Sequence, residues 1–402
     1  MPGPLPGPTG VPGTGQATTI VTGPTNVYDI AQDDTYLYYT IHVPNNGSVV
    51  AVPKSSMGDV APIVLASGGT ANTPWGVTCD PGTTGYVYYT DFLATPQGKV
   101  YRVPKPVNGA AAGAAEVLMT GLNLPTFIRF NDVVGGDGLL YTCENVASNG
   151  RILRLTKTGL SQDPTASTFI NMGTNIQPAY NLHLFSVNGT AQLWFTQMAT
   201  DLSTGAQGQV RFINTSTTGP VALTSTTLVG TGLLNPSDCW LHQTSATATD
   251  VIWTEYDQSN GGARSASINS TSVRGTSIGQ AQGSISFVPP ASVKVNQASH
   301  QAFLTRNAQQ VNGGGIYIVN LTSDLATEIT VSASGGGVTG GVNYPFQFVG
   351  DATYGLFATE FNYTTGDTGS TNPSNIVRLG FPMTFSKTGA SLPEENFSFV
   401  NQ

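Results

Sequence analysis

Charged side chains are scarce in this chain. Of its 402 residues, 15 are Lys or Arg and 23 are Asp or Glu, so 9% are charged, against about a quarter in an ordinary soluble domain. The basic residues form no run or patch, which argues against nucleic acid and anionic membrane surfaces as partners. No stretch approaches the roughly 18 apolar residues that a membrane-spanning helix needs, so membrane insertion is not expected.

Signals for secretion, redox chemistry and common catalysis are lacking as well. The N-terminal sequence MPGPLPGPTGVPGTGQ has no basic region and no apolar core, and the first basic residue is Lys54, so no Sec signal peptide is predicted. Cys79, Cys143 and Cys239 are odd in number and have no metal-like spacing, which favours buried apolar roles. The chain has no GxSxG elbow, phosphate-binding loop or metalloprotease helix motif.

One short block recurs seven times: apolar or aromatic residues followed by Thr. It reads YLYYT, YVYYT, LLYT, LWFT, VIWT, AFLT and LFAT, and it ends at Thr40, Thr90, Thr142, Thr196, Thr254, Thr305 and Thr359. A Pro precedes each block by 14 to 18 residues, at Pro24, Pro74, Pro125, Pro178, Pro236, Pro290 and Pro345. A polar loop, usually a Gly, and two further strand-like segments follow each Thr.

Each unit therefore holds four short strands within about 50 residues, which predicts an all-β, seven-bladed β-propeller of four-stranded antiparallel blades. The segment Ala17–Thr22 reads as a strand that precedes the first unit. We predict that it closes the ring by joining the C-terminal blade, which leaves no open edge. Residues 396–400 (NFSFV) are the alternative closing strand.

Two segments carry a resemblance to known propeller families. Residues 74–103 contain PWGVTCD, YVYYTD and GKVYRV, and they resemble the repeats of NHL, YWTD and streptogramin-lyase-like propellers. LWFTQ and GQVRF, within residues 193–212, are similar to the lyase-like repeat. The resemblance spans nearly the whole chain but lies in blade-forming residues, so it implies the fold and not an activity.

The first 16 residues differ from the rest of the chain. They are rich in Pro and Gly and contain a few collagen-like triplets, too few for a stable triple helix unless the remainder trimerises. A flexible or polyproline tail is favoured over a collagen-like stalk. Residues 17–402 are predicted to form one propeller, and whether the last 20 or so residues form a C-terminal extension stays open.

The loops after each repeat Thr vary most in length and predict the binding face. The residues directly after Thr should form a ring near the central funnel, which makes Asp91, Glu255, Arg306 and Glu360 candidate ligand-binding residues, with an ion-pair network among the last three. The alternative is that they are strand-end charges, solvated or paired with neighbours.

Aromatic residues close to the same Pro and Thr landmarks are further candidates. They are Trp75, Trp240, Tyr256 and Phe361, together with Tyr180 and Phe346. Such side chains stack on sugars or anchor partner proteins. Packing between blades would use the same residues, and that alternative is favoured.

Lyase-like and lactonase-like propellers, as families, hold a divalent metal at the centre with His and acidic residues, which makes His183, His242 and Glu255 weak candidate ligands for a divalent cation. No other cofactor is expected.

The leading interpretation is a non-catalytic recognition or structural propeller on a virion-like particle or cell surface, with a protein or carbohydrate partner and the tail as a docking arm. A metal-dependent lyase or lactonase and an intracellular interaction scaffold are the alternatives.

Overall fold

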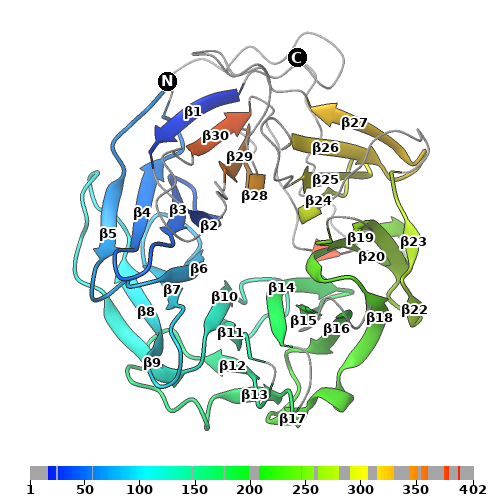
Figure 1. Ribbon diagram of the computed structural model, residues 1–402, viewed down its shortest axis with the longest axis horizontal. Coiled ribbons are helices and arrows are strands. Elements are labelled where there is room, and N and C mark those ends of the chain that lie inside the picture. Colours follow the sequence, from blue (N-terminus) through cyan, green and yellow to red (C-terminus); the bar gives the residue numbers. More distant parts are fainter. Residues whose placement is uncertain are drawn as a thin grey trace.

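The computed structural model forms a ring of seven small β-sheets around a central axis (Figure 1). Each sheet is one blade, and the first strand of each blade lies nearest the axis. This arrangement confirms the seven-bladed propeller that the repeat predicts. The structure describes residues 17–23, 26–56, 58–146, 148–174, 178–198, 208–245, 247–257, 261–279, 290–306, 315–329, 345–351, 355–360, 375–379 and 388–389.

From the axis outward, the first three blades contain these strands. Blade 1 has β2 (Val27–Gln32), β3 (Tyr36–Ile41), β4 (Ser48–Pro53) and β5 (Ile63–Ser67). Blade 2 has β6 (Pro74–Cys79), β7 (Tyr86–Asp91), β8 (Gly98–Pro104) and β9 (Glu116–Leu122). Blade 3 has β10 (Pro125–Phe130), β11 (Leu140–Glu144), β12 (Arg151–Leu155), β13 (Thr168–Asn171) and an added parallel strand, β17 (Val221–Ala222).

Blades 4 to 6 continue the same order. Blade 4 has β14 (Ala179–Val187), β15 (Thr190–Gln197), β16 (Gly208–Asn214) and β18 (Thr227–Leu233), with β22 (Ser272–Val273) outside and β31 (Thr388–Gly389) parallel to β14. Blade 5 has β19 (Pro236–Ser245), β20 (Ala248–Glu255), β21 (Gly262–Ser267) and β23 (Thr276–Ser277). Blade 6 has β24 (Pro290–Asn296), β25 (Gln301–Arg306), β26 (Gly315–Asn320) and β27 (Leu325–Ile329). A 3-10 turn, η1 (Leu223–Ser225), precedes β18.

Blade 7 is built from both ends of the chain. It has β28 (Pro345–Asp351), β29 (Gly355–Glu360) and β30 (Asn375–Leu379), and its outer strand is β1 (Ala17–Thr22). β1 runs antiparallel to β30, from Ala17 opposite Leu379 to Thr22 opposite Asn375. The predicted closure by the N-terminal strand is confirmed, whereas residues 396–400 and the tail 1–16 lie outside the described residues.

The repeated Thr side chains bind neighbouring blades together. The pairing of the first two strands shifts register near the start of each first strand, as a β-bulge does. In blade 2, the Gly76 N–H donates to Thr90 Oγ1 at 2.9 Å, and that hydroxyl donates to the Thr126 carbonyl of blade 3. All seven repeat Thr residues are buried. Thr40 and Thr305 make the same two bonds as Thr90 and so satisfy backbone groups that the bulge would leave unpaired, whereas Thr142 Oγ1 has no hydrogen-bond partner among the described residues.

The repeated Pro and Gly residues meet across the same blade boundaries. A Cβ added to Gly47 would clash with the Pro74 ring, and one added to Gly98 would lie 2.7 Å from Pro125 Cδ. Gly208 and Pro236 have the same relationship. Each pair leaves no room for a side chain at the Gly, which explains why both residue types recur with the blade.

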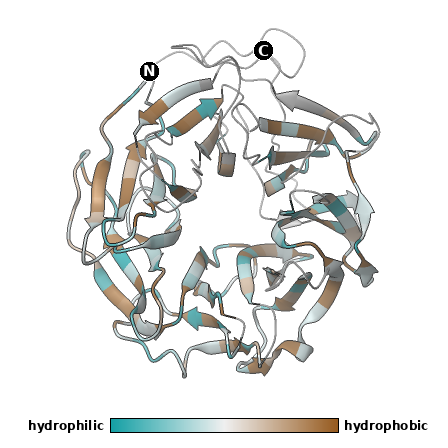
Figure 2. Cartoon of the chain, in the orientation of Figure 1, coloured by the Kyte–Doolittle hydropathy of each residue, from teal (hydrophilic) through white to brown (hydrophobic). Residues whose placement is uncertain are grey.

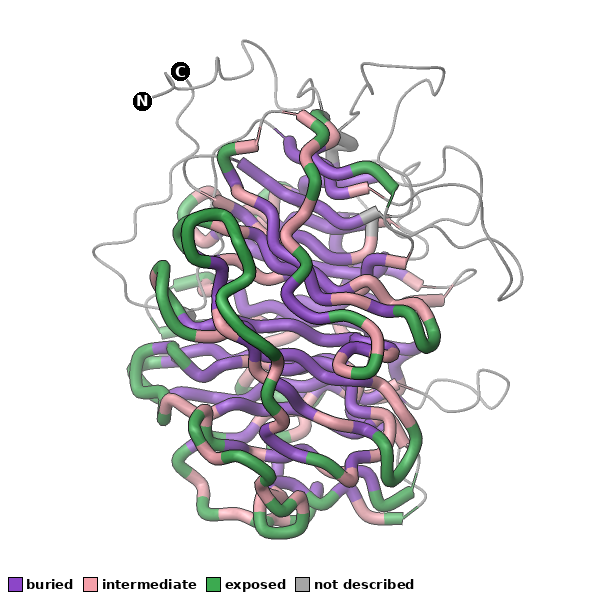
Figure 3. Tube along the Cα trace, turned by 90° about the vertical axis from the view of Figure 1, so that its left-hand side faces the viewer, coloured by how far each residue is buried: buried purple, intermediate pink, exposed green. Residues whose placement is uncertain are grey.

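Hydrophobic side chains fill the spaces between adjacent blades. Separate clusters join blades 1 and 2, 2 and 3, 3 and 4, 6 and 7, and 7 and 1, and a larger one joins blades 4 to 6. Hydrophobic residues recur along the strands of the blades (Figure 2), and exposed residues gather in the connecting loops (Figure 3). Cys79, Cys143 and Cys239 are buried free thiols, as their strand contexts predict. Within the described part of the chain, no helix has the length and apolar character that crossing a membrane requires.

Lysines at the ends of third strands form ion pairs with the preceding blade. Lys105 of blade 2 contacts Asp33 of blade 1 at 2.9 Å, and Lys157 of blade 3 contacts Asp80 of blade 2 at 2.7 Å. Lys54 of blade 1 contacts Asp351 of blade 7 at 2.5 Å, so an equivalent ion pair also joins the two blades where the ring closes.

Candidate functional site

A cavity of about 400 Å³ lies on the central axis. The first strands form its wall, with side chains that include Asp29, Arg129, His183, Trp240, Lys294 and Gln347. It is also lined by Asp34, Gly82, Asp132 and Asp351, which lie in or border the turns between first and second strands. The cavity therefore opens toward the face opposite the loops that follow each repeat Thr.

Of the described carboxylates on the first strands, that of Asp238 accepts the most hydrogen bonds. It is fully buried on β19. Its Oδ1 accepts from Asn181 Nδ2 at 2.9 Å and contacts His183 Nε2 at 2.5 Å. Its Oδ2 accepts from the Val293 N–H at 3.0 Å and from Lys294 Nζ at 3.3 Å. One carboxylate thus joins the inner strands of blades 4, 5 and 6.

Burial sets the protonation states of this cluster. Burial lowers the pKa of His183 to about 4, although the carboxylate of Asp238 acts in the opposite direction. The ring is therefore neutral at pH 7, and its Nε2–H donates to Asp238. Burial alone would raise the pKa of Asp238, but Lys294 and His183 hold it far below its ordinary range. Burial lowers the pKa of Lys294, with Asp238 opposing that shift and Arg129 adding to it.

A second ion pair lies on the other side of the axis. Arg129 Nη1 of blade 3 donates to Asp29 Oδ2 of blade 1 at 2.8 Å. The same Asp29 oxygen accepts from the Val77 N–H of blade 2 at 2.9 Å, just as Asp238 accepts from Val293 in the next blade. In both pairs the acid lies deeper than the cation. The side chains of Asp29 and Asp238 are 1% and 0% exposed, whereas those of Arg129 and Lys294 are 17% and 9% exposed.

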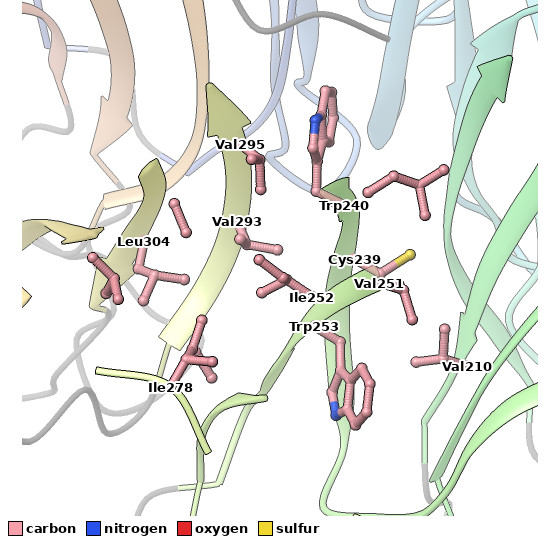
Figure 4. Close-up of a cluster of buried hydrophobic side chains, with 14 of the residues drawn as sticks. Val210, Cys239, Trp240, Val251, Ile252, Trp253, Ile278, Val293, Val295 and Leu304 are labelled. Atoms are coloured by element: carbon pink, nitrogen blue, oxygen red, sulfur yellow. The ribbon is translucent and has the colours of Figure 1, made fainter. Parts of the chain in front are cut away.

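Trp240 lies between the cavity and the core. Its ring extends from β19 away from Trp253, which points to the opposite end of the cluster in Figure 4. Lys294 Nζ lies 4.4 Å from the Trp240 ring centroid, a cation–π contact. Trp240 is 5% exposed, and its indole N–H has no partner among the described residues.

Asp91 and Glu255, two candidates from the residues after Thr, are fully buried and do not face the cavity. Asp91 accepts from the Thr73 N–H at 2.6 Å, and burial raises the pKa of its carboxyl group. Glu255 accepts from Arg274 at 3.0 Å and lies 3.5 Å from Arg264. The loop that enters each blade covers the end of the second strand, so these acids bind framework groups.

The structure pairs Glu255 and Arg306 with other residues and not with each other, and the side chain of Glu360 is not among those described. Arg306 Nη1 donates to the Tyr317 hydroxyl at 3.2 Å, while Glu255 pairs with the arginines of its own blade. Glu360 ends β29, and Phe361 lies outside the described residues. Tyr256 is half-buried, and its N–H donates to the Asn235 carbonyl at 2.8 Å.

The aromatic candidates separate into two places. Trp75 packs against Tyr28 and Phe92, with ring centroids 4.3 and 4.5 Å away, and Tyr180 lies 6.4 Å from it. Phe346 lies 5.7 Å from Tyr28 in the same cluster. These rings lie near the repeat Pro residues, and none of them lines the cavity. Trp240 alone among the aromatic candidates does.

The three candidate metal ligands are not brought together. His183 contacts Asp238, whereas His242 Nε2 contacts His300 Nδ1 at 2.9 Å. Glu255 lies opposite Pro236, at the other end of the β19–β20 hairpin from His242. Among the described residues, no group of three or more His, Cys, Asp or Glu side chains is placed to hold a metal ion.

No protein-family model and no curated protein sequence matches the chain. Solved structures of propellers do match. The WD40 domain of Toxoplasma gondii coronin has a TM-score of 0.51 at 9% identity, over 98% of this chain and 96% of that one. The polysaccharide lyase Uly1 has a TM-score of 0.50 at 9% identity, over 89% of each chain. At such low identity the likeness shows the β-propeller fold alone.

Asp29, Arg129, Asp238 and Lys294 were missed by sequence reasoning. They are single polar residues within short apolar strands, and no loop or motif marks them. A signal does exist in their spacing from the repeat Pro. Arg129 and Lys294, like Trp240, each follow that Pro by four residues and so take equivalent places around the axis.

Proposed function

We propose that this protein is a non-catalytic recognition propeller that binds an oxygen-rich carbohydrate unit in its central cavity. The observation that carries the proposal is the placement of charge in the cavity wall. Arg129 and Lys294 line the cavity, and their side chains are more exposed than those of Asp29 and Asp238, the acids that neutralise them. Within the wall, Arg129 and Lys294 offer N–H donors that suit hydroxyl and carboxylate oxygens of a ligand, whereas the acids Asp34, Asp132 and Asp351 lie at the mouth of the cavity.

The size of the cavity supports the same ligand class. Its volume of about 400 Å³ falls within the range of about 300–1,000 Å³ that small-molecule sites occupy. Arg129 Nη1 donates to Asp29 and to the Val77 and Ile128 carbonyls, and Nη2 donates to Asp29 Oδ1 at 3.4 Å. A planar guanidinium with five donors retains further N–H groups for a carboxylate or a pair of hydroxyls.

The His183–Asp238 pair is the one arrangement in the cavity that an enzyme of the lyase or lactonase kind could use. General acid–base catalysis works best with a pKa near the working pH. Burial holds the pKa of His183 at about 4, and its Nε2 is already bonded to Asp238. The His183–Asp238 pair therefore fits a structural role in the cavity wall better than a role in proton transfer.

Isothermal titration calorimetry with glucuronate and methyl glucoside tests the proposal. A charge-assisted hydrogen bond contributes about 1.5–3 kcal/mol, so Arg129→Gln should weaken glucuronate binding by roughly ten- to hundredfold. Arg154→Gln is the matched control, because Arg154 donates to the Thr215 carbonyl away from the cavity. Ala31→Trp adds bulk at a position that lines the cavity and also packs against the cluster between blades 1 and 2, and it should abolish binding.

Failure of both sugars to bind the wild-type chain, or equal binding by Ala31→Trp, would overturn the proposed site. Turnover of either sugar that His183→Gln abolishes would instead support the enzyme. A fluorescence melting curve of each variant separates loss of binding from loss of fold. Display on a particle and the docking role of residues 1–16 stay predictions from the sequence.

A further inference from the structure

Two histidines from adjacent blades meet outside the cavity. His242 lies near the end of β19 in blade 5, and His300 lies in the turn between β24 and β25 of blade 6. His242 Nε2 and His300 Nδ1 are 2.9 Å apart, and the ring centroids are 5.2 Å apart. Neither residue lines the central cavity.

We propose that His242 and His300 together bind one divalent transition-metal ion of the Cu²⁺, Ni²⁺ and Zn²⁺ class. Imidazole nitrogen is a preferred ligand of these ions. Two nitrogens that each lie about 2.0–2.1 Å from one ion are about 2.9–3.4 Å apart, for ligand angles between square and tetrahedral. On binding, the ring that donates the present hydrogen bond carries its proton on its other ring nitrogen instead, so both facing nitrogens offer lone pairs to the ion. The remaining coordination positions are open to water.

The turn that carries His300 is fixed against β19 on both sides of His242. Gln297 Nε2 donates to the Leu241 carbonyl at 2.5 Å, and Gln297 Oε1 accepts from the Gln243 N–H at 2.9 Å. One side chain thus clamps the residues immediately before and after His242. Ligands held in place before the ion arrives lose little conformational entropy on binding.

The turn also has internal support. Asn296 Oδ1 accepts from the Ala298 and Ser299 N–H groups, at 3.1 and 3.3 Å. His300 itself is exposed and has a φ of 49°, in the left-handed region. Asn and Gly suit that backbone conformation equally well, so the turn does not require an imidazole at this position.

The His242 ring is ready to bind at neutral pH. His242 is 7% exposed, and burial, with His300 as the second cause, lowers its pKa to about 4. It is therefore unprotonated at pH 7, as a metal ligand must be. His300 provides access to solvent, which gives an ion a way in.

Calorimetric titration of the untagged full chain with NiCl₂ tests the site. We expect one ion per chain, and at least a tenfold loss of affinity in His300→Asn, which keeps the left-handed turn. Gln297→Ala should weaken binding about 10–100-fold, as loss of a positioning partner does. His42→Gln is the matched control, because His42 contacts the Pro74 carbonyl in another part of the ring.

Electron paramagnetic resonance with CuSO₄ supplies a readout that a purely structural histidine pair would not affect. Two equivalent imidazole nitrogens should split the copper signal of the wild-type chain, and only one should remain in His300→Asn. Unchanged stoichiometry and spectrum in that variant, or no binding by the wild type beyond that of His242→Gln, would overturn the proposal.

Discussion

Replacement of Asp238 by Asn tests how the inner strands are held together. The carboxylate contacts His183, Lys294 and the Val293 N–H, from the blades on either side. Asn keeps the shape and one acceptor oxygen but removes the negative charge. The Lys294 ammonium group then stays buried without its counter-ion.

The expected loss is large because little solvent reaches this pair. The side chain of Lys294 is 9% exposed and that of Asp238 is 0% exposed. The solvent screening that weakens surface ion pairs is therefore small here. Removing one partner of a buried ion pair costs about 3–5 kcal/mol. That is a large share of the roughly 5–15 kcal/mol that stabilises a typical protein.

Urea unfolding followed by tryptophan fluorescence measures this loss. The midpoint should fall while the slope stays constant, since the surface exposed on unfolding is unchanged. Asp34→Asn is the matched control, because Asp34 is exposed at the cavity mouth and should change stability by less than about 0.5 kcal/mol. Asp238→Asn combined with Lys294→Met should recover part of the loss, because the double variant no longer buries an unpaired ammonium group. A loss below about 1 kcal/mol in the single variant would refute the reasoning.

Two further predictions concern protonation and ring closure. The pKa of His183 is lowered from 6.5 in the unfolded chain to about 4 in the fold, so the unfolded state binds more protons between these values and stability falls as pH drops from 6.5 to 4. At 1.36 kcal/mol per pKa unit the effect is at most about 3 kcal/mol, and His183→Gln should flatten that part of a urea-midpoint-versus-pH curve. Lys54→Met should destabilise the ring closure by about 2–3 kcal/mol in urea unfolding, because the side chains of Lys54 and Asp351 are only 4% and 13% exposed. Lys157→Met, whose lysine is 33% exposed, should cost less than about 1 kcal/mol. Equal losses in the two lysine variants would contradict the dependence of the loss on burial.

The fold could be predicted because its repeated residues perform the same physical task at several blade boundaries. Thr90 bonds backbone groups of two blades, and Gly98 and Pro125 meet at the same boundary. Such contacts depend on the geometry of adjacent blades, so they recur wherever that geometry recurs. Closure by β1 was also predictable, since a strand without a unit of its own must find an open edge.

The candidate site could not be predicted from the same signal. The repeat marks framework positions, and the residue after each Thr lies where the incoming loop covers the strand end, as Thr73 covers Asp91. Loop length predicted the opposite face as the binding face, and much of three long loops there lies outside the described residues. The cavity wall instead uses positions inside the first strands, where a polar residue has no distinctive neighbours in the sequence.

The charged groups of the cavity wall depart from sevenfold symmetry. Asp29 and Asp238 accept the same backbone N–H from the following blade, so their structural task is equivalent. Their cations are not equivalent: Lys294 comes from the next blade, whereas Arg129 comes from two blades away. Arg129 reaches Asp29 across the inner strand of blade 2, where its Nη1 also donates to the Val77 carbonyl at 3.4 Å. A ring of seven identical groups could position only a ligand of matching symmetry, but two unlike pairs across the axis define an orientation. A carbohydrate, which has different groups on each edge, requires such an asymmetric wall.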